Sequence, residues 1–206
     1  LVSAKRISKG EFKMNTIVTT LTTEAVFSDD GVKRDLLSKT WDEKKPKLAI
    51  IMLSPSVADG IQLDTTTQLV INNASRLGYG SVAIVNLSAV LNDFTLSHSE
   101  EDPENINVIL DMAKSAEALV YAPGTGKSKS KTFLCLQERV LLALKDYESK
   151  LYCLCNEDGD GRLQHPLSPQ VRTWSLSPLK ISELITIPTE AEQKPKKKQS
   201  RCAIKQ

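Results

Sequence analysis

The chain contains few of the residues that build metal centres and aromatic clusters. Only two histidines and four cysteines occur in 206 residues, and aromatic residues make up 5%. The cysteines, at positions 135, 153, 155 and 202, show no metal-ligand spacing, and the two histidines add little to them. We therefore expect no metal site, no cofactor, and reduced, structural thiols.

Long hydrophobic runs are also absent. No apolar segment of the sequence approaches the roughly 20 residues that a membrane-spanning helix needs, and no signal peptide is evident. The composition, with 40% hydrophobic and 25% charged residues, is that of an ordinary globular domain. We expect a cytoplasmic protein with no membrane partner.

Charge is unevenly distributed along the chain, although the net charge is only +2. The tail from Lys194 contributes +6 and the segment before Met14 contributes +3, which leaves −7 for residues 14–193. A body of this charge does not attract phosphate backbones through its overall field. Contact with nucleic acid would depend on a local basic patch or on the tail, which we interpret either as a solubilising end or as a nucleic-acid-binding arm.

Composition divides the chain into three parts. Residues 1–13 are expected to be a cloning remnant or disordered, with Met14 as a candidate natural start. Residues 14–188 have the length and apolar content of one α/β domain. Residues 189–206 lack apolar periodicity and are expected to form a disordered basic tail.

The central part of the chain alternates between strand and helix patterns. Residues 24–41 predict a β-hairpin around the turn sequence Ser28-Asp29-Asp30-Gly31. The expected strands after it are 48–53, 81–87, 118–121 and 151–154, and the expected helices are 65–77, a segment beginning at 102, and 132–147. This order is typical of a three-layer α/β/α domain with a mainly parallel central sheet and an N-terminal β-hairpin.

Polar motifs follow three of the predicted strands. Met52-Leu53-Ser54-Pro55-Ser56 ends the first, Asn86-Leu87-Ser88 ends the second, and His165-Pro166-Leu167-Ser168-Pro169 follows the fourth through a turn. Ligands of open α/β sheets bind at the carboxyl ends of strands. We therefore predict that these loops form the walls of one crevice, in which Asn86 and His165 offer hydrogen bonds to a base.

A glycine-rich segment, Gly124-Thr125-Gly126-Lys127-Ser128, lies between the third strand and the third helix. It lacks the first glycine of a P-loop, so an ATPase is not expected. Its amides can cradle an anion or a nucleic-acid backbone, helped by Lys127, Lys129 and Lys131. The alternative is a solvated loop without a ligand.

The strand-end motifs resemble those of domain-of-unknown-function family 1643, whose usual signature is Met-Leu-Asn-Pro-Ser-x-Ala-Asp, then Asp-x-Thr, Asn-Leu and His-Pro-Leu. The matching segments are Met52 to Asp59, Asp64-Thr65-Thr66, Gly78-Tyr79-Gly80, Asn86-Leu87 and His165-Pro166-Leu167. The resemblance extends over residues 25–176. It implies genes carried on mobile elements and phages, with a role in replication, defence or counter-defence.

The order of these motifs is also similar, at greater distance, to the uracil-DNA glycosylase superfamily. That similarity implies the glycosylase fold, a first loop that positions the attacking water, an asparagine that reads the base edge, and a His-Pro loop that stabilises the departing base. The candidate catalytic residues are then Ser54 and His165. The candidate ligand-binding residues are Pro55, Ser56, Asp59, Asp64, Asn86, Pro166 and Ser168.

Two departures from the glycosylase pattern argue against efficient base excision. Ser54 replaces the aspartate or asparagine that positions water, and a hydroxyl cannot act as a carboxylate base. No aromatic residue of the first loop is placed to stack on a base. We therefore expect a nucleic-acid- or nucleobase-associated protein, with single- or double-stranded DNA and a replication or defence protein as its partners.

Two alternatives stay open. One is a weak or divergent N-glycosidic hydrolase that acts on a modified base or nucleotide, with the water held by Ser54, Asp59 or Asp64. The other is a protein-interaction scaffold that uses the same fold, which would suit the acidic body. Asp59 and Asp64 can also be simple turn and helix-cap residues.

Overall fold

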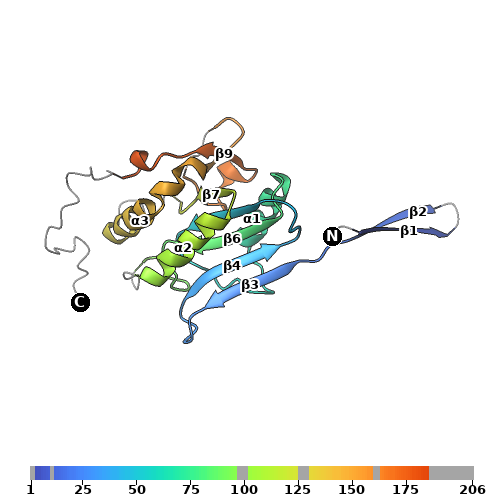
Figure 1. Cartoon of the computed structure of the whole chain (residues 1–206), viewed down its shortest axis with the longest axis horizontal. Helices are drawn as coiled ribbons and strands as arrows, with labels where there is room; N and C mark the ends of the chain where they lie inside the picture. Colours follow the sequence, from blue (N-terminus) through green and yellow to red (C-terminus); the bar gives the residue numbers. More distant parts are fainter. Residues whose placement is uncertain (1–2, 10–11, 97–101, 125–129, 160–162, 186–206) are drawn as a thin grey trace.

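The computed structural model describes residues 3–9, 12–96, 102–124, 130–159 and 163–185. Strands β1 (Ser3–Lys9) and β2 (Phe12–Val18) pair with each other in a separate antiparallel sheet. This hairpin extends away from the rest of the molecule (Figure 1). Residues 1–13, expected to be a cloning remnant or disordered, contain β1 and the start of β2.

The main body is built on a seven-stranded sheet with the order β3-β4-β6-β5-β7-β8-β9. The strands are β3 (Thr22–Phe27), β4 (Arg34–Thr40), β5 (Lys47–Met52), β6 (Ser81–Asn86), β7 (Ala118–Tyr121), β8 (Leu151–Cys155) and β9 (Ser175–Pro178). The four central strands are parallel, whereas β3, β4 and β9 pair antiparallel.

The expectation of a mainly parallel sheet was therefore wrong in part, because only the centre of the sheet is parallel. The predicted hairpin of residues 24–41 is confirmed as β3 and β4. It is not an appendage, since β4 pairs with β6 and makes the hairpin one edge of the sheet. At the opposite edge, β9 returns beside β8 and was not predicted, because a four-residue strand containing two serines and a proline has no clear apolar pattern.

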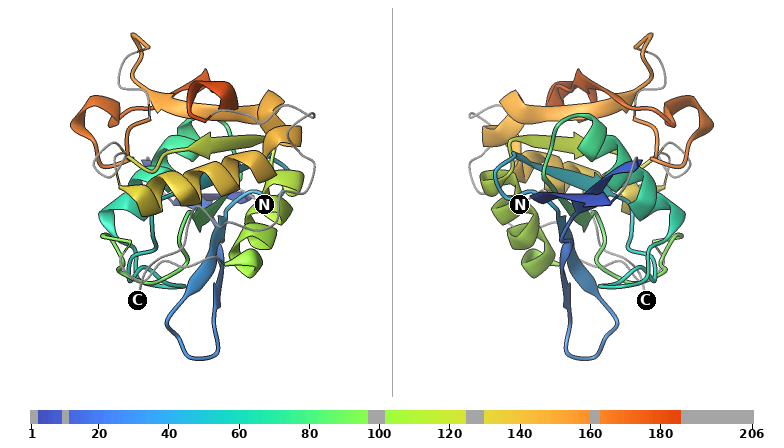
Figure 2. Two further views of the ribbon diagram at one scale, coloured as in Figure 1. Left: turned by 90° about the vertical axis from the view of Figure 1, so that its left-hand side faces the viewer. Right: turned by 90° about the vertical axis from the view of Figure 1, so that its right-hand side faces the viewer.

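Three α-helices cover the two faces of the sheet. Each begins at a residue whose side chain accepts a hydrogen bond from the first turn: Asp64 for α1 (Thr65–Arg76), Asp102 for α2 (Pro103–Ser115) and Ser130 for α3 (Lys131–Ala143). Helices α2 and α3 lie side by side (Figure 2) and pack on one face, whereas α1 packs on the other. The α/β class and the α/β/α layering follow from these positions.

The described residues also form short 3-10 helices. They are η1 (Lys145–Lys150), η2 (Pro169–Val171) and η3 (Ile181–Glu183). The third helix was expected to continue to residue 147, but α3 ends at Ala143 and η1 follows. No described helix combines the length and the apolarity needed to cross a membrane.

Two apolar clusters form the core. The first joins alternate residues of the central strands to α2 and α3, and the second joins the remaining strand residues to α1 and to Trp174, which is fully buried. Continuous apolar strands such as β5 and β7 supply both clusters because parallel strands are covered on both faces. Cys153 and Cys155 are buried free thiols, as expected, whereas Cys135 is disulfide-bonded, so the expectation of reduced thiols was wrong for that residue.

A β-bulge in β4 decides which charged residues reach the α1 face. Val26 of β3 faces Leu36 while the next residue, Phe27, faces Arg34, so Asp35 is the extra residue of the bulge. The bulge reverses the alternation of side chains, and Arg34 therefore points to the same face as Leu37 and Lys39. Both cations are almost fully buried, with exposed fractions of 2% and 1%.

Candidate functional site

A pocket lies at the carboxyl ends of the parallel strands. The chain passes from β5 to β6 by way of α1 on one face, and from β7 to β8 by way of α3 on the other. Since β5 and β7 are neighbours, their loops leave the sheet in opposite directions and open a crevice between them. Crevices of this kind are the usual ligand sites of open α/β sheets.

The pocket has a volume of about 450 Å³, within the usual range for small-molecule sites. Its lining combines hydroxyl groups, one carboxylate, one imidazole and one guanidinium with several apolar side chains. The lining residues are Arg34, Met52, Leu53, Ser54, Ser56, Asp64, Thr65, Thr66, Thr67, Phe94, Pro123, His165 and Leu167. Residues from five separate segments thus meet at one place.

The loop between β5 and α1 is held by two buried cations of β4. The Arg34 guanidinium donates Nη1–H to the carbonyl oxygens of Ser56, at 3.2 Å, and of Ala58. The Lys39 ammonium donates to the carbonyl oxygens of Asp59, at 3.1 Å, and of Gly60, at 2.8 Å. Burial lowers the pKa of both cations, and nearby aspartates oppose that effect. The bulge in β4 therefore positions this wall of the pocket.

Asp64 is both the N-cap of α1 and a lining residue. Its Oδ1 accepts the Thr67 backbone N–H at 2.6 Å, and its Oδ2 accepts the Ser56 hydroxyl. Burial, the largest influence, would raise the pKa of Asp64, but the hydrogen bonds from Ser56 and Thr67 and the charge of Arg34 together lower it. The side chain is consequently an ionised carboxylate with both oxygens engaged, and it is a weak base.

His165 has a defined tautomer. Its Nδ1 accepts the backbone N–H of Leu167 at 3.2 Å, so the neutral ring carries its proton on Nε2. Burial lowers the pKa of His165, although the charge of Asp64 opposes that shift, and the ring is therefore neutral near pH 7. Nε2 has no hydrogen-bond partner among the residues that the structure describes, which leaves one N–H donor for a ligand.

Gly124 allows His165 to come close to the chain after β7. Gly124 has φ of +82°, which disfavours other residues, and a Cβ atom placed there would lie 3.2 Å from the His165 Cβ. The Pro123-Gly124 segment and the His165 segment therefore pack directly against each other. The glycine at the start of the predicted anion loop thus has a packing role in the described residues.

Phe94 gives the pocket an exposed aromatic side chain. It is 54% exposed and lies in the loop after β6, between Asn92 and Leu96, which both have positive φ. Leu163, two residues before His165, is the third such non-glycine residue of the described chain. Left-handed backbone at non-glycine residues costs of order 1 kcal/mol each and often occurs at binding sites.

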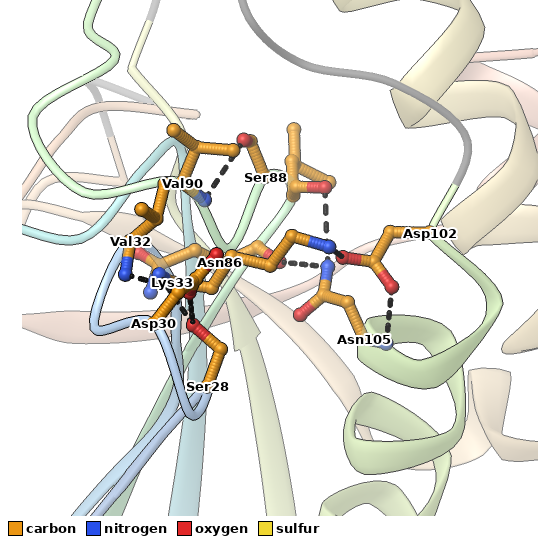
Figure 3. Close-up of polar contacts among 10 residues, drawn as sticks. Ser28, Asp30, Val32, Lys33, Asn86, Ser88, Val90, Asp102 and Asn105 are labelled. Carbon is orange, nitrogen blue, oxygen red and sulfur yellow. Dashed lines mark hydrogen bonds and ion pairs between the residues drawn. The ribbon is translucent and has the colours of Figure 1, made fainter.

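Asn86 stands at a strand end, as predicted, but it does not line the pocket. It is fully buried at the end of β6, beside Met52 of β5, and it is not among the lining residues. From the α2 side, Asn105 donates to the carbonyl oxygens of Asn86, at 3.0 Å, and Leu87, near the Lys33–Asp102 ion pair (Figure 3). Neither polar atom of the Asn86 side chain has a partner. The structure does not bring Asn86 and His165 into one lining.

Of the other predicted site residues, Ser54, Ser56 and Asp64 join His165 in the pocket, whereas Pro55, Asp59, Pro166 and Ser168 do not line it. Asp59 is a turn residue, because its Oδ1 accepts the N–H groups of Ile61 and Gln62, both at 2.7 Å. Lys131 is the first residue of α3 and is not in the lining. Lys127 and Lys129 lie outside the described residues. No group of metal-ligating residues occurs in the described part of the chain.

Sequence reasoning missed several lining residues, of which Arg34, Phe94, Pro123 and the threonines of α1 are the most informative. Arg34 is brought to the pocket by a bulge that has no sequence signature. Phe94 had a usable signal, since a phenylalanine in a polar loop of a chain with few aromatics needs an explanation. Thr65, Thr66 and Thr67 could have been predicted as lining residues, because they form the first turn of the helix that Asp64 caps.

The comparison with protein families finds the same family that the sequence motifs resemble. The model of the family described as "Protein of unknown function (DUF1643)" matches residues 34–167. This chain belongs to the DUF1643 family. The matched region begins at Arg34 and ends at Leu167, so it contains every lining residue of the pocket. No match was found among the curated proteins or among the solved structures.

Proposed function

We propose that this DUF1643 protein binds a nucleobase in the pocket between β5 and β7, either in single-stranded nucleic acid or as a nucleotide, and that it does not excise the base efficiently. The fold would then be a divergent form of the uracil-DNA glycosylase type. The observation that carries the proposal is the pairing of an exposed aromatic ring, Phe94, with a fixed N–H donor, His165 Nε2, in one pocket.

Phe94 suits the face of a base, and His165 suits its edge. Aromatic side chains stack on the faces of bases in single strands, and each such contact contributes about 1–3 kcal/mol. Leu167, 39% exposed, adds apolar surface to the same pocket. The His165 N–H can donate to a carbonyl oxygen or ring nitrogen at the base edge. The pocket is mostly apolar with a few directed polar groups, as is usual for small-molecule sites.

The same geometry argues against base excision. Hydrolysis of an N-glycosidic bond needs a group that positions and deprotonates water. Ser54 supplies only a hydroxyl, and the carboxylate of Asp64 is engaged by Ser56 and Thr67 and has a lowered pKa. The pocket therefore has groups that recognise a base and lacks a free general base among its described residues.

The binding test uses a matched pair of phenylalanines. Calorimetric titration of the chain with the 5′-monophosphates of the five common deoxynucleosides, and with a single-stranded 12-mer, measures affinity. Phe94→Ala should weaken binding by at least about fivefold, because about 1–3 kcal/mol of stacking is lost. Phe27→Ala removes a similarly exposed ring, 42% exposed, outside the lining and should change affinity by less than twofold.

Absence of binding by all these probes at millimolar concentration, or equal losses in the two variants, would overturn the proposal. Incubation with uracil-containing and modified-base oligonucleotides tests the excision part separately. We expect no base release above the buffer control. Release that His165→Ala abolishes would instead favour the hydrolase alternative.

A further inference from the structure

We infer that the ligand of this pocket carries a phosphate group, which binds at the N-terminus of α1 beside Arg34. The inference rests on the proposed function, because it concerns the same pocket and narrows the ligand from a base to a nucleotide. Three observations carry it: free backbone donors, a buried cation with an unpartnered donor, and a buried hydroxyl without a partner.

The first turn of α1 offers free N–H groups to the pocket. The backbone N–H of Thr67 donates to the Asp64 side chain and that of Gln68 to the Asp64 carbonyl oxygen. The backbone N–H groups of Thr65 and Thr66 have no partner among the described residues, and both residues line the pocket. N–H groups at a helix N-terminus bind anions because they carry the positive end of the helix dipole.

The second and third observations are independent of the helix. Arg34 is 2% exposed and lines the pocket, and its Nε has no hydrogen-bond partner. The Ser54 hydroxyl is also buried without a partner in the same lining. Buried donors without partners are uncommon in proteins, because each loses its hydration without compensation. A phosphate oxygen in this part of the pocket can accept from both groups.

The charges of the lining permit an anion. Asp64 contributes a negative charge, but Arg34 offsets it, and both carboxylate oxygens already accept hydrogen bonds. His165 is neutral, so it adds no charge of either sign. What remains for a ligand is a set of donors: two backbone N–H groups, the Arg34 Nε–H and the Ser54 hydroxyl. Phosphate oxygens are strong hydrogen-bond acceptors and suit a site made of such donors.

The test removes one backbone donor without breaking the helix. Thr65 is the first residue of α1, where proline is favoured, and Asp64 has φ −84° and ψ 169°, which a following proline tolerates. Helix α2 already begins with Pro103 at the same position. Thr65→Pro therefore deletes the N–H together with the threonine side chain. Thr65→Ala keeps the N–H and deletes the hydroxyl and the methyl group. Lys131→Pro deletes an N–H at the first residue of α3, outside the lining.

Affinities of the full chain are measured for each deoxynucleoside and its 5′-monophosphate, with inorganic phosphate as competitor. We expect the monophosphate to bind about tenfold more tightly than the nucleoside, as charge-assisted hydrogen bonds allow. Thr65→Pro should lower this ratio about threefold, Thr65→Ala should lower it less, and Lys131→Pro should leave it unchanged. Ser54→Ala should lower the ratio about threefold, which keeps the test decisive if Thr65→Pro does not fold.

The possible failures are distinguishable. If nucleoside and monophosphate bind equally tightly, or if Thr65→Pro folds and keeps the wild-type ratio, the phosphate inference is wrong while the proposed nucleobase function stands. If neither compound binds, the proposed function itself is wrong. Binding of inorganic phosphate that Thr65→Pro does not weaken would place the anion elsewhere and would also overturn the inference.

Discussion

The two walls of the pocket are held in place by different physical means. The loop between β5 and α1 is fixed by hydrogen bonds from buried charges, since Arg34 and Lys39 bind four of its carbonyl oxygens. The opposite wall, formed by Pro123, Gly124 and the His165 segment, is fixed by close packing and by one local hydrogen bond to the imidazole.

The comparison separates fold stability from ligand recognition. The first wall depends on β4, so substitutions there should destabilise the edge of the sheet as well as the pocket. The second wall depends on a single close contact, so substitutions there should weaken ligand binding while lowering the free energy of unfolding less. Substitutions that loosen one wall at a time can test this division.

The largest expected effect is the loss of the buried guanidinium. Arg34→Ala leaves the carbonyl oxygens of Ser56 and Ala58 without a donor and should lower the free energy of unfolding by about 3 kcal/mol. Arg34→Lys, which keeps a cation, should cost less. Urea denaturation of the three proteins measures the difference. A loss below about 0.5 kcal/mol in Arg34→Ala would show that the charged residues of β4 do not hold this wall.

The next effect concerns the packed wall. Gly124→Ala should weaken ligand binding about tenfold, because a Cβ atom 3.2 Å from the His165 Cβ must displace the imidazole segment. Gly159→Ala is the matched control: its φ of +86° imposes a similar backbone strain, but no atom lies within 4 Å of the added Cβ. Equal changes in affinity for the two variants would mean that the contact between Gly124 and His165 is unimportant.

The pH dependence of stability should show a smaller contribution from His165. Burial lowers its pKa in the folded state below the usual 6.5, so the unfolded chain binds this proton more readily. The contribution of His165 to the free energy of unfolding is fully present above pH 6.5 and is lost as the pH falls through the folded-state pKa. The free energy of unfolding should change by at most about 1.4 kcal/mol per pH unit from this residue. The His165→Gln variant should lack this pH-dependent contribution. Identical pH profiles for wild type and variant would contradict a neutral, half-buried imidazole.

The smallest effect separates the two aspartates of the first wall. Asp59 forms a turn outside the lining, so Asp59→Asn should change ligand affinity by less than twofold. Asp64 lines the pocket, so Asp64→Asn should change ligand affinity several-fold. Asparagine caps a helix as well as aspartate does, so the helical circular-dichroism signal should stay the same. If Asp59→Asn affected binding more strongly than Asp64→Asn, then Asp59 rather than Asp64 would belong to the ligand site.

The sequence predicted the features that depend on local patterns. The apolar runs that became β5, β6, β7 and β8, the start of α2 at Asp102 and the β3–β4 turn each have a signal within a few residues. The crevice at the strand ends followed from strand order, and it brought Ser54, Ser56, Asp64 and His165 together. Family membership was also evident from short motifs spaced along the chain.

The remaining features depend on contacts that no local pattern records. The bulge at Asp35 turns Arg34 toward the pocket, and β9 pairs only because the chain returns beside β8. Asn86 stands at a strand end as predicted, yet it is fully buried and is not in the lining, although Met52 beside it is. A strand end fixes the place of a residue along the sheet, but neighbouring strands decide whether its side chain is accessible.

The imidazole of His165 offers the most direct test of the nucleobase site. The chain has only two histidines, so a nitrogen-15 spectrum of histidine-labelled protein is simple, and His165→Gln assigns it. We predict an unprotonated Nδ1 and a protonated Nε2 at pH 7, and a shift of the Nε2–H signal when a deoxynucleoside monophosphate binds. A spectrum with the proton on Nδ1, or one that a saturating nucleotide leaves unchanged, would contradict the account.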